Sequence, residues 1–198
     1  TRANPVQYVY NVNTDTGLTQ IKELLTNGYI LVYGTYINSW QFTTIKNDSA
    51  DTADDPYVGK PIAYWLNGTN GAHGMAIVGY SDAIWTDVNN NGVVDAGEKG
   101  ALRIANSWGT GWGEGGFTWL AYDALRNPST ITGAPSANRM AAFFSNMVYV
   151  LTVKPGYSPT MIAEFTLNHA KRNQLAMRLG VSDTTATTPS TNWYPFAI

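Results

Sequence analysis

Cysteine is absent from this 198-residue chain. Its absence excludes disulfide bonds, thiolate metal sites and any thiol nucleophile carried by the chain itself. Charged residues are also scarce, at 13% of the sequence, where about a quarter is usual. Hydrophobic residues make up 44%, and glycine and aromatic residues are plentiful. This composition favours a well-packed, β-rich and exported protein.

Basic clusters and long apolar runs are absent too. The formal net charge is -2 and no run of lysine or arginine occurs, so the charge pattern of a nucleic-acid or anionic-membrane binder is missing. No apolar stretch reaches the length of a membrane span, and no charged-then-apolar leader opens the sequence. We therefore expect neither nucleic acid nor a membrane as partner. An extracellular or secreted location, the cell surface included, is expected, and Thr1 suggests a processed chain because it is no initiator residue.

The apolar pattern predicts an α+β fold that is mainly β. Residues 5–13 alternate as a strand does, and Thr14 is a suitable N-cap for a helix whose apolar residues recur every three or four positions over 18–25. Residues 29–37 form the next apolar strand. Residues 38–70 are polar and irregular, which predicts a long surface excursion.

Composition divides the chain into three parts. Residues 1–153 hold most of the apolar segments, and residues 154–160 contain two prolines and a glycine, as linkers do. Residues 161–198 alternate like strands but carry few large apolar groups, so we expect them to begin a β-sandwich-like module or to dock as strands on the first part. A carbohydrate- or surface-binding role for this last part would depend on the exposure of Trp193 and Tyr194.

Two polar residues stand at the ends of apolar strands. His73 opens the strand predicted over 71–80, and Asn106 ends the strand predicted from residue 101, ahead of a Gly- and Trp-rich turn. A hairpin between the strands would bring both residues to one sheet edge. An amide oxygen that accepts from one imidazole nitrogen fixes the tautomer and leaves the other nitrogen to exchange a proton with a nucleophile. The alternative is structural: an asparagine that ties up a turn and a histidine with a satisfied hydrogen bond.

The segment GAHGMAIVGY, followed by IANSWGTGWGEGGF, resembles the second half of papain-like cysteine peptidases. The resemblance extends over residues 5–153 and implies a β-barrel subdomain with one N-terminal helix, acting on peptide or protein substrates. It implies that His73 is the general base, Asn106 the amide that orients it, and Trp108 a shield of their hydrogen bond. It further places Trp112 on the primed side of the cleft and Gly71 and Ala72 at the border of a substrate pocket.

The nucleophile of that family is missing from this sequence. Its cysteine and oxyanion glutamine would precede the histidine by roughly 130 residues or more, whereas 72 residues precede His73. The resemblance therefore implies the His/Asn-bearing part of an endopeptidase, whose partner is a missing or separate N-terminal half that carries the cysteine. The alternative is a non-catalytic papain-fold module used for binding or assembly. The lack of cysteine fits this alternative, and the intact His/Asn/Trp set favours the enzyme.

The loop from Asp87 to Glu98 matches the calcium-loop pattern D-x-[DN]-x-[DN]-G-x5-E without a gap. Such a loop offers oxygen ligands to a hard cation and places a glycine at its sharp turn. Because its flanks have strand patterns, we expect one structural calcium ion in a loop insertion of a bacterial-type member, and not a paired EF-hand. The alternative is a polar hairpin without an ion. The predicted ligands are the side chains of Asp87, Asn89, Asn91, Asp95 and Glu98 and the carbonyl of Val93.

Overall fold

The computed structural model describes residues 4–153, 156, 164, 166–168, 170–171 and 178–193. Contacts divide the chain into two compact units, Thr1–Tyr157 and Ser158–Ile198. The boundary falls in the segment 154–160 that the sequence predicts as a linker. Apart from Gly156, that segment lies outside the described residues.

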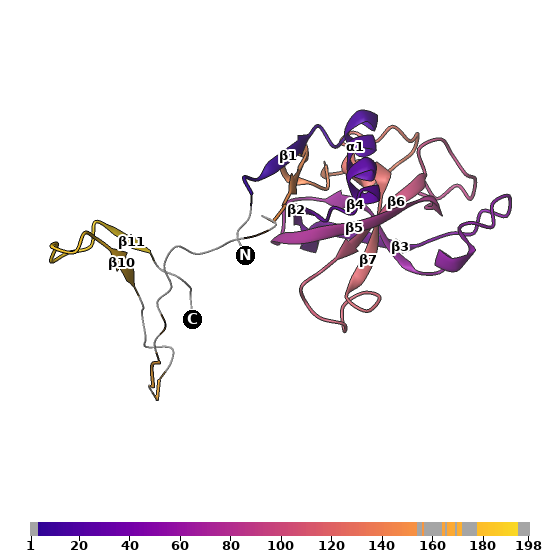
Figure 1. Cartoon of the computed structure of the whole chain (residues 1–198). Coiled ribbons are helices and arrows are strands. Elements are labelled where there is room, and N and C mark those ends of the chain that lie inside the picture. The colour runs from indigo at the N-terminus through magenta and orange to yellow at the C-terminus, as the bar shows by residue number, and fades with distance from the viewer. Residues whose placement is uncertain are drawn as a thin grey trace. The chain divides into compact units, whose positions relative to one another are not determined.

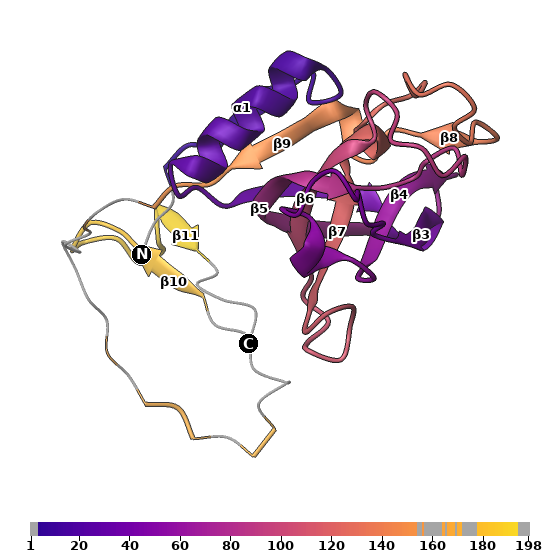
Figure 2. The same cartoon turned by 90° about the vertical axis from the view of Figure 1, so that its right-hand side faces the viewer.

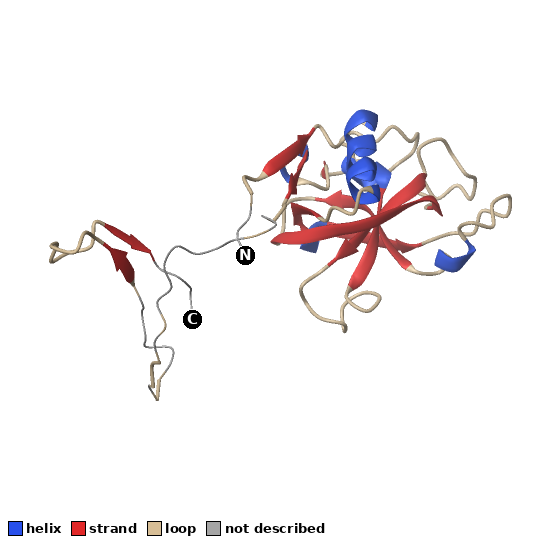
Figure 3. Ribbon diagram, viewed as in Figure 1, coloured by secondary structure: helices blue, strands red, loops and turns tan. Residues whose placement is uncertain are grey.

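The first unit is mainly β, with one α-helix, as Figures 1 and 3 show. This confirms the predicted class of an α+β fold dominated by strands. Short 3-10 turns cover Ile37–Ser39, Asp55–Tyr57, Tyr122–Leu125 and Phe144–Asn146. The regular elements are β1 (Gln7–Tyr10), α1 (Asp15–Thr26), β2 (Leu31–Tyr36), β3 (Trp40–Thr44), β4 (Pro61–Asn67), β5 (Ala72–Trp85), β6 (Lys99–Ala105), β7 (Phe117–Ala121), β8 (Arg139–Met140) and β9 (Met147–Val150).

These strands form one mixed sheet in the order β1-β9-β2-β5-β6-β7-β4-β3, and β8 pairs with β4. The β4–β7 pair is parallel and the other ladders are antiparallel. The sheet is open, because within residues 4–153 no ladder joins β1 to β3. The expected barrel is therefore not closed by hydrogen bonds in this part of the chain. Its two end strands, β1 and β3, are short, and among the described residues each pairs with one neighbour.

The single helix has the cap and the apolar stripe that the sequence predicts. Thr14 accepts a hydrogen bond from the Gly17 nitrogen at 3.2 Å, which satisfies one of the free donors of the first turn. Ile21 is fully buried, and α1 packs against β1 and β5. Figure 2 shows the helix lying beside the sheet. Among the described residues, none of the helices has the length and apolar character needed to cross a membrane.

The segment 38–70 is more regular than its composition predicts. It contains β3 and β4, which pair with each other from Trp40 and Leu66 at one end to Thr44 and Pro61 at the other. Trp40 and Leu66 are buried in the core. The prediction of one long excursion was wrong because the polar residues around these two strands hid their alternation. Within this segment, loops remain over residues 45–60, around the short turn Asp55–Tyr57, and over residues 68–70.

The sheet has apolar clusters on both faces. Leu102 and Leu120 belong to the main cluster, whereas their chain neighbours Ala101 and Trp119 belong to a second, smaller cluster. Successive strand residues point to opposite faces, so the smaller cluster covers the outer face near β4 and β7. The cluster also reaches β6 at Ala101 and the far end of β5 at Ile84, whereas the outer face at β2 and at the Ala76–Ala105 end of the hairpin lies beyond it.

The second unit is described in part. Leu179–Val181 (β10) pairs antiparallel with Thr191–Trp193 (β11), and the Ser190 nitrogen donates to the Val181 carbonyl at 2.9 Å. A hairpin agrees with the alternating pattern of this region, while a β-sandwich module or docked strands stays a prediction. The side chain of Trp193 and the whole of Tyr194 lie outside the described residues.

Candidate functional site

His73 and Asn106 meet at one end of the β5–β6 hairpin. His73 is the second residue of β5 and pairs with Thr35 of β2, and Asn106 directly follows β6. The antiparallel register sets Ala76 opposite Ala105, so the two polar residues lie at the same sheet edge. The distance between His73 Nε2 and Asn106 Oδ1 is 2.8 Å. The contact expected from the sequence is therefore formed.

This hydrogen bond defines the state of the imidazole. Asn106 Oδ1 is a carbonyl oxygen and only accepts, and it also accepts from the Ser107 nitrogen at 2.7 Å. His73 Nε2 consequently donates, and Nδ1 carries the lone pair of the neutral ring. Within the described residues Nδ1 makes no hydrogen bond. The hydrogen bond to Asn106 thus engages one nitrogen of the half-buried ring and leaves the other without a partner in this part of the chain.

Of the two tryptophans in the turn after β6, Trp108 packs on the imidazole and Trp112 packs on Trp108. The ring centroid of Trp108 lies 4.7 Å from that of His73, with 31° between the planes. Trp112 meets Trp108 edge-on at 6.1 Å and packs partly against the main core. Trp108 is 51% exposed, so it covers one face of the ring and remains open to solvent on the other.

An ion network holds this turn to the sheet. The Glu114 carboxylate lies 2.8 Å from Lys60 Nζ and 2.8 Å from an Arg103 nitrogen. Hydrogen bonds from Lys60 and then from Arg103 hold the pKa of Glu114 below its ordinary value. The Arg103 guanidinium lies over the rings of Phe117 and Trp119, at 5.2 and 4.9 Å from their centroids. Sequence reasoning missed this network because Lys60 is far from the turn along the chain.

Gly71 and Ala72 immediately precede His73, as the resemblance requires. Gly71 has φ +73°, and a Cβ there would lie 2.5 Å from the Asn38 side chain, so only glycine fits. An apolar hollow beside the His/Asn pair has a different lining, formed by Val32, Gly74, Met75, Ala76, Ala105, Asn106 and Ser107. Gly71 and Ala72 lie outside that lining. The outward-facing small residues of β5 were the signal that could have predicted it.

The hollow is part of a longer apolar row on the outer sheet face. Strand pairing places six residues side by side across β1, β9, β2, β5, β6 and β7, and each is exposed or half-buried. The row starts at exposed aromatic rings and passes the small residues beside the His/Asn pair. Its members are Tyr8, Tyr149, Val32, Ala76, Ala105 and Phe117.

The predicted calcium loop joins β5 to β6 at the end of the hairpin away from His73. Both carboxylate oxygens of Asp87 accept backbone N–H groups, from Asn91 and Gly92, at 3.0 Å each. The side-chain amides of Asn89 and Asn91 both donate to Asp95 Oδ2 at 2.7 Å. Four of the predicted ligands are therefore gathered, and two amide N–H groups face the Asp95 charge.

Glu98 takes a different position from the other predicted ligands. It is 1% exposed, and its carboxylate accepts from Trp85 Nε1 at 2.9 Å, the Val88 nitrogen at 2.7 Å and the Asp95 nitrogen at 3.1 Å. In the described part of the chain, no three His, Asp or Glu residues form a metal-holding group. The loop nevertheless offers carboxylate, amide and carbonyl oxygens only, and such donors fit a hard cation such as calcium.

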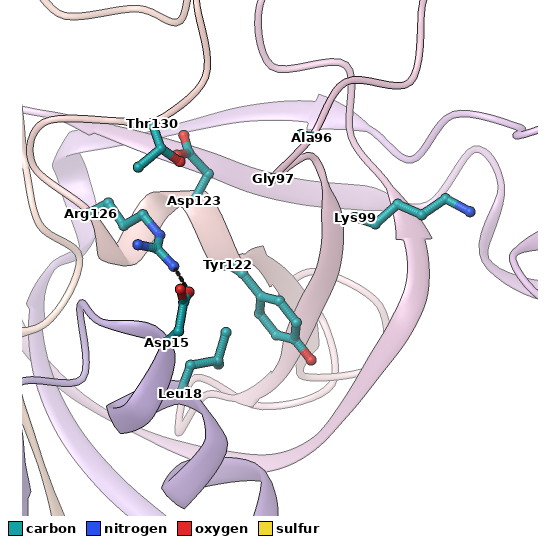
Figure 4. Close-up of a pocket in the computed structure, with 9 residues that line it drawn as sticks. All are labelled: Asp15, Leu18, Ala96, Gly97, Lys99, Tyr122, Asp123, Arg126 and Thr130. Carbon is teal, nitrogen blue, oxygen red and sulfur yellow. Dashed lines mark hydrogen bonds and ion pairs between the residues drawn. The ribbon is translucent and has the colours of Figure 1, made fainter.

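A hollow between α1 and the Tyr122–Leu125 turn carries several charges (Figure 4). Arg126 pairs with Asp15 across it. Asp123 is buried and bonded to Arg139 at 2.6 Å, and Lys99 points away from the hollow (Figure 4) toward Asp48 and Asp51. Because each of these charges is already paired, we assign the hollow a structural role in packing α1 against the turn and do not treat it as a candidate site.

Comparison with known proteins matched no family model and no curated protein to this chain. The resemblance to papain-like peptidases therefore depends on the two sequence motifs and on the residues that carry them.

Proposed function

We propose that residues 5–153 are the His/Asn-bearing half of a papain-like cysteine endopeptidase. The observation that carries the proposal is the 2.8 Å hydrogen bond from His73 Nε2 to Asn106 Oδ1, beside the Trp108 ring. In this proposal Nδ1 takes the proton of a cysteine thiol, and the resulting imidazolium stabilises the thiolate. The thiolate attacks the peptide carbonyl, and His73 then returns the proton to the leaving amine. Asn106 holds the ring throughout.

The cysteine would come from an N-terminal half, missing here or a separate chain, which packs on the outer sheet face. The apolar row from Tyr8 to Phe117 supports this partner, because it runs past the His/Asn pair and leaves apolar side chains open. Asn106 Nδ2 is a second support: it is buried and, within the described residues, has no hydrogen-bond partner. The papain-like barrel of the resemblance belongs to this same proposal, with the open sheet of this chain as one wall of the cleft.

Substrates in this proposal are peptides or proteins. The apolar hollow at Val32, Gly74 and Ala76 adjoins Asn106 and contains no charged side chain. It would accept an uncharged substrate side chain next to the scissile bond, while Trp112 would line the side of the leaving segment.

Calcium would be a structural ion in the loop from Asp87 to Glu98. The residues that would hold it are the predicted ligands already gathered there, with the Val93 carbonyl completing the set. The ion would neutralise the loop carboxylates and fix the hairpin that carries His73 and Asn106. A single weak site of this kind suits calcium-rich surroundings, which supports an extracellular or secreted location, the cell surface included.

The alternative proposal is a non-catalytic papain-fold module for binding or assembly. The observation that favours it is the absence of cysteine from the sequence. In that case the apolar row would receive a partner without a thiol, and the His73–Asn106 bond would serve structure alone.

Native mass spectrometry of the protein purified from its source distinguishes the peptidase proposal from the binding-module proposal. The peptidase proposal expects a bound, cysteine-bearing polypeptide whose thiol reacts with iodoacetamide at neutral pH. His73→Ala should slow that alkylation by about tenfold or more, because the thiolate is stabilised by the imidazolium. The matched control is His169→Ala, which changes the other histidine of the chain. A protein that carries no thiol under conditions that preserve complexes would support the binding module instead.

A further inference from the structure

Four Asn–Gly pairs occur in the chain, at Asn27, Asn67, Asn70 and Asn91. Asparagine is among the thermolabile residues, and a following glycine favours loss of its amide because no Cβ hinders the approach of the glycine nitrogen. Reaction requires that this nitrogen and the side-chain amide are free to meet. The structure separates the four pairs by this criterion.

In two of the pairs, Asn27–Gly28 and Asn91–Gly92, hydrogen bonds restrain both the glycine nitrogen and the asparagine side-chain amide. The Gly28 nitrogen donates to the Leu25 carbonyl at 3.0 Å, and Asn27 Nδ2 donates to the Glu23 carbonyl at 2.9 Å. The Asn27 pair therefore needs two bonds broken before it reacts.

The Asn91 pair is held more firmly still. The Gly92 nitrogen donates to Asp87 Oδ2 at 3.0 Å. The side-chain amide of Asn91 accepts from the Val93 nitrogen at 2.8 Å and donates to Asp95 at 2.7 Å. Reaction at this pair requires loss of three hydrogen bonds in the loop.

The Asn70 pair lacks these restraints. Asn70 is exposed, and within residues 4–153 neither its side-chain amide nor the Gly71 nitrogen makes a hydrogen bond. Its own backbone nitrogen donates to Ser39 at 2.9 Å, and the Gly71 carbonyl accepts from the Ile37 nitrogen at 2.9 Å. These two bonds anchor the flanks, while the groups that react, the Asn70 side-chain amide and the Gly71 nitrogen, have no hydrogen bond to break among the described residues.

The fourth pair, Asn67–Gly68, is intermediate. Asn67 ends β4 and pairs with Arg139 of β8, so its backbone is held in a ladder that restricts the rotation toward Gly68.

We propose that Asn70 is a site of spontaneous covalent modification, which converts it to aspartate and isoaspartate. The Gly71 nitrogen loses its proton to solvent and attacks Asn70 Cγ. An N–Cγ bond forms, the Cγ–Nδ2 bond breaks and ammonia leaves. The main chain then contains a five-membered cyclic imide. Water then opens the imide at either carbonyl. The net change is one amide and one water converted to one carboxylic acid and one ammonia.

The product places a new carboxylate three residues before His73, beside Gly71 and Ala72. The isoaspartate form also lengthens the main chain by one atom, in a turn where the Gly71 carbonyl and the Asn70 nitrogen are both bonded to Ile37–Ser39. Modification is therefore expected to alter the backbone at the start of β5. This effect does not depend on peptidase activity.

The test is incubation of the folded full chain at pH 8.5 and 37 °C, followed by peptide mapping at intervals and by methyltransferase labelling of isoaspartate. Asn70 should lose ammonia at least about tenfold faster than Asn27 and Asn91, because each of those must first break two or more hydrogen bonds. In urea, where the hydrogen bonds are absent, the four pairs should react at similar rates. Asn70→Gln should remove the dominant product and leave the slower ones unchanged.

Two results would overturn the proposal. One is a folded protein in which Asn27 or Asn91 reacts as fast as Asn70. The other is a folded protein in which Asn67 loses ammonia faster than Asn70.

Discussion

The imidazole of His73 is restrained by two residues of different chemistry. Asn106 fixes its tautomer through one hydrogen bond, and Trp108 covers one ring face at a centroid distance of 4.7 Å. In the proposed reaction, a ring held in this way would lose little further freedom on acting as a base. The other ring nitrogen remains available, and it is the atom on which the proposed function depends.

Glu114 supports this arrangement at the residue scale, and its carboxylate gives a pH-dependent prediction. Its pKa is lowered in the folded state by Lys60 and Arg103. A lowered pKa means that the stabilisation is fully present above the unfolded value of about 4.3 and is lost as the pH falls through the folded value. We expect Glu114→Gln to lower the urea midpoint at pH 7 and to have a progressively smaller effect below pH 4. Urea unfolding of both proteins from pH 3 to 7 measures this.

Glu23→Gln is the control for that series, because Glu23 lies on the exposed side of α1. Its effect should be small at every pH. An effect of Glu114→Gln that is the same at pH 3 and pH 7 would contradict the role given to the ion network.

The sequence predicted the side-chain contacts of some residues and not those of others. The His73–Asn106 contact was predictable, because both residues stand at the ends of strands joined by one hairpin. The Glu114 network was not, since its partner Lys60 is brought near only by the parallel β4–β7 pairing. Glu98 matched its motif position, yet its burial against Trp85 depends on side-chain packing that no spacing rule contains.

At the scale of elements, the turn between β6 and β7 depends on one glycine in particular. Gly113 has φ +54°, and a Cβ there would lie 2.3 Å from the Phe117 carbonyl oxygen. Gly113→Ala should therefore destabilise the protein by about 1–3 kcal/mol through backbone strain. Gly111→Ala is a matched control in the same turn, because nothing lies within 4 Å of its added Cβ. Equal urea midpoints for the two variants would contradict this account.

The calcium loop gives a second prediction at this scale. If the ion binds the folded loop alone, calcium at a hundred times its dissociation constant adds about 2.7 kcal/mol of stability, or about 5–10 °C in Tm for a chain of this size. Differential scanning calorimetry with and without calcium measures the shift. Trp85 emission should change as well if Glu98 moves toward the ion, because Glu98 accepts from the Trp85 indole.

Asp95→Asn should abolish most of that calcium effect, since the Asp95 carboxylate lies at the centre of the predicted ligands and accepts hydrogen bonds from the side-chain amides of Asn89 and Asn91. Asp183→Asn, outside the loop, should leave it intact. Equal Tm values for the wild-type protein with and without calcium would favour a polar hairpin without an ion.

Elements were predictable where apolar periodicity was clean. The pattern predicted α1 with its Thr14 cap, and it predicted β2 and β6 within two residues of their observed bounds. It predicted the start of β5, but the strand continues five residues past the predicted end, to Trp85. It missed β3 and β4, because the polar residues before, between and after these two strands hid their alternation. The open end of the sheet was also unpredictable, since closure depends on which distant strands pair.

At the scale of the whole molecule, the buried apolar residues of the described part of the chain all come from the first unit, from Val9 to Val150. The residues described in the second unit, from Glu164 to Asn192, are exposed. The hydrophobic contribution to folding is proportional to the apolar area removed from water. Stability should therefore reside in the first unit.

A chain shortened to Thr1–Tyr157 tests this distribution. We expect it to fold with a Tm within about 2–4 °C of the full chain, which corresponds to a change of no more than about 1 kcal/mol. The His73 ring should give the same histidine NMR signals in both proteins, because both of its restraints lie within residues 4–153. A fall in Tm of 10 °C or more, or a shifted His73 signal, would mean that residues 158–198 pack on the first unit and complete its core. The open outer face of the sheet would then be partly covered by the chain itself, and the surface left for a cysteine-bearing partner would be smaller than the apolar row from Tyr8 to Phe117.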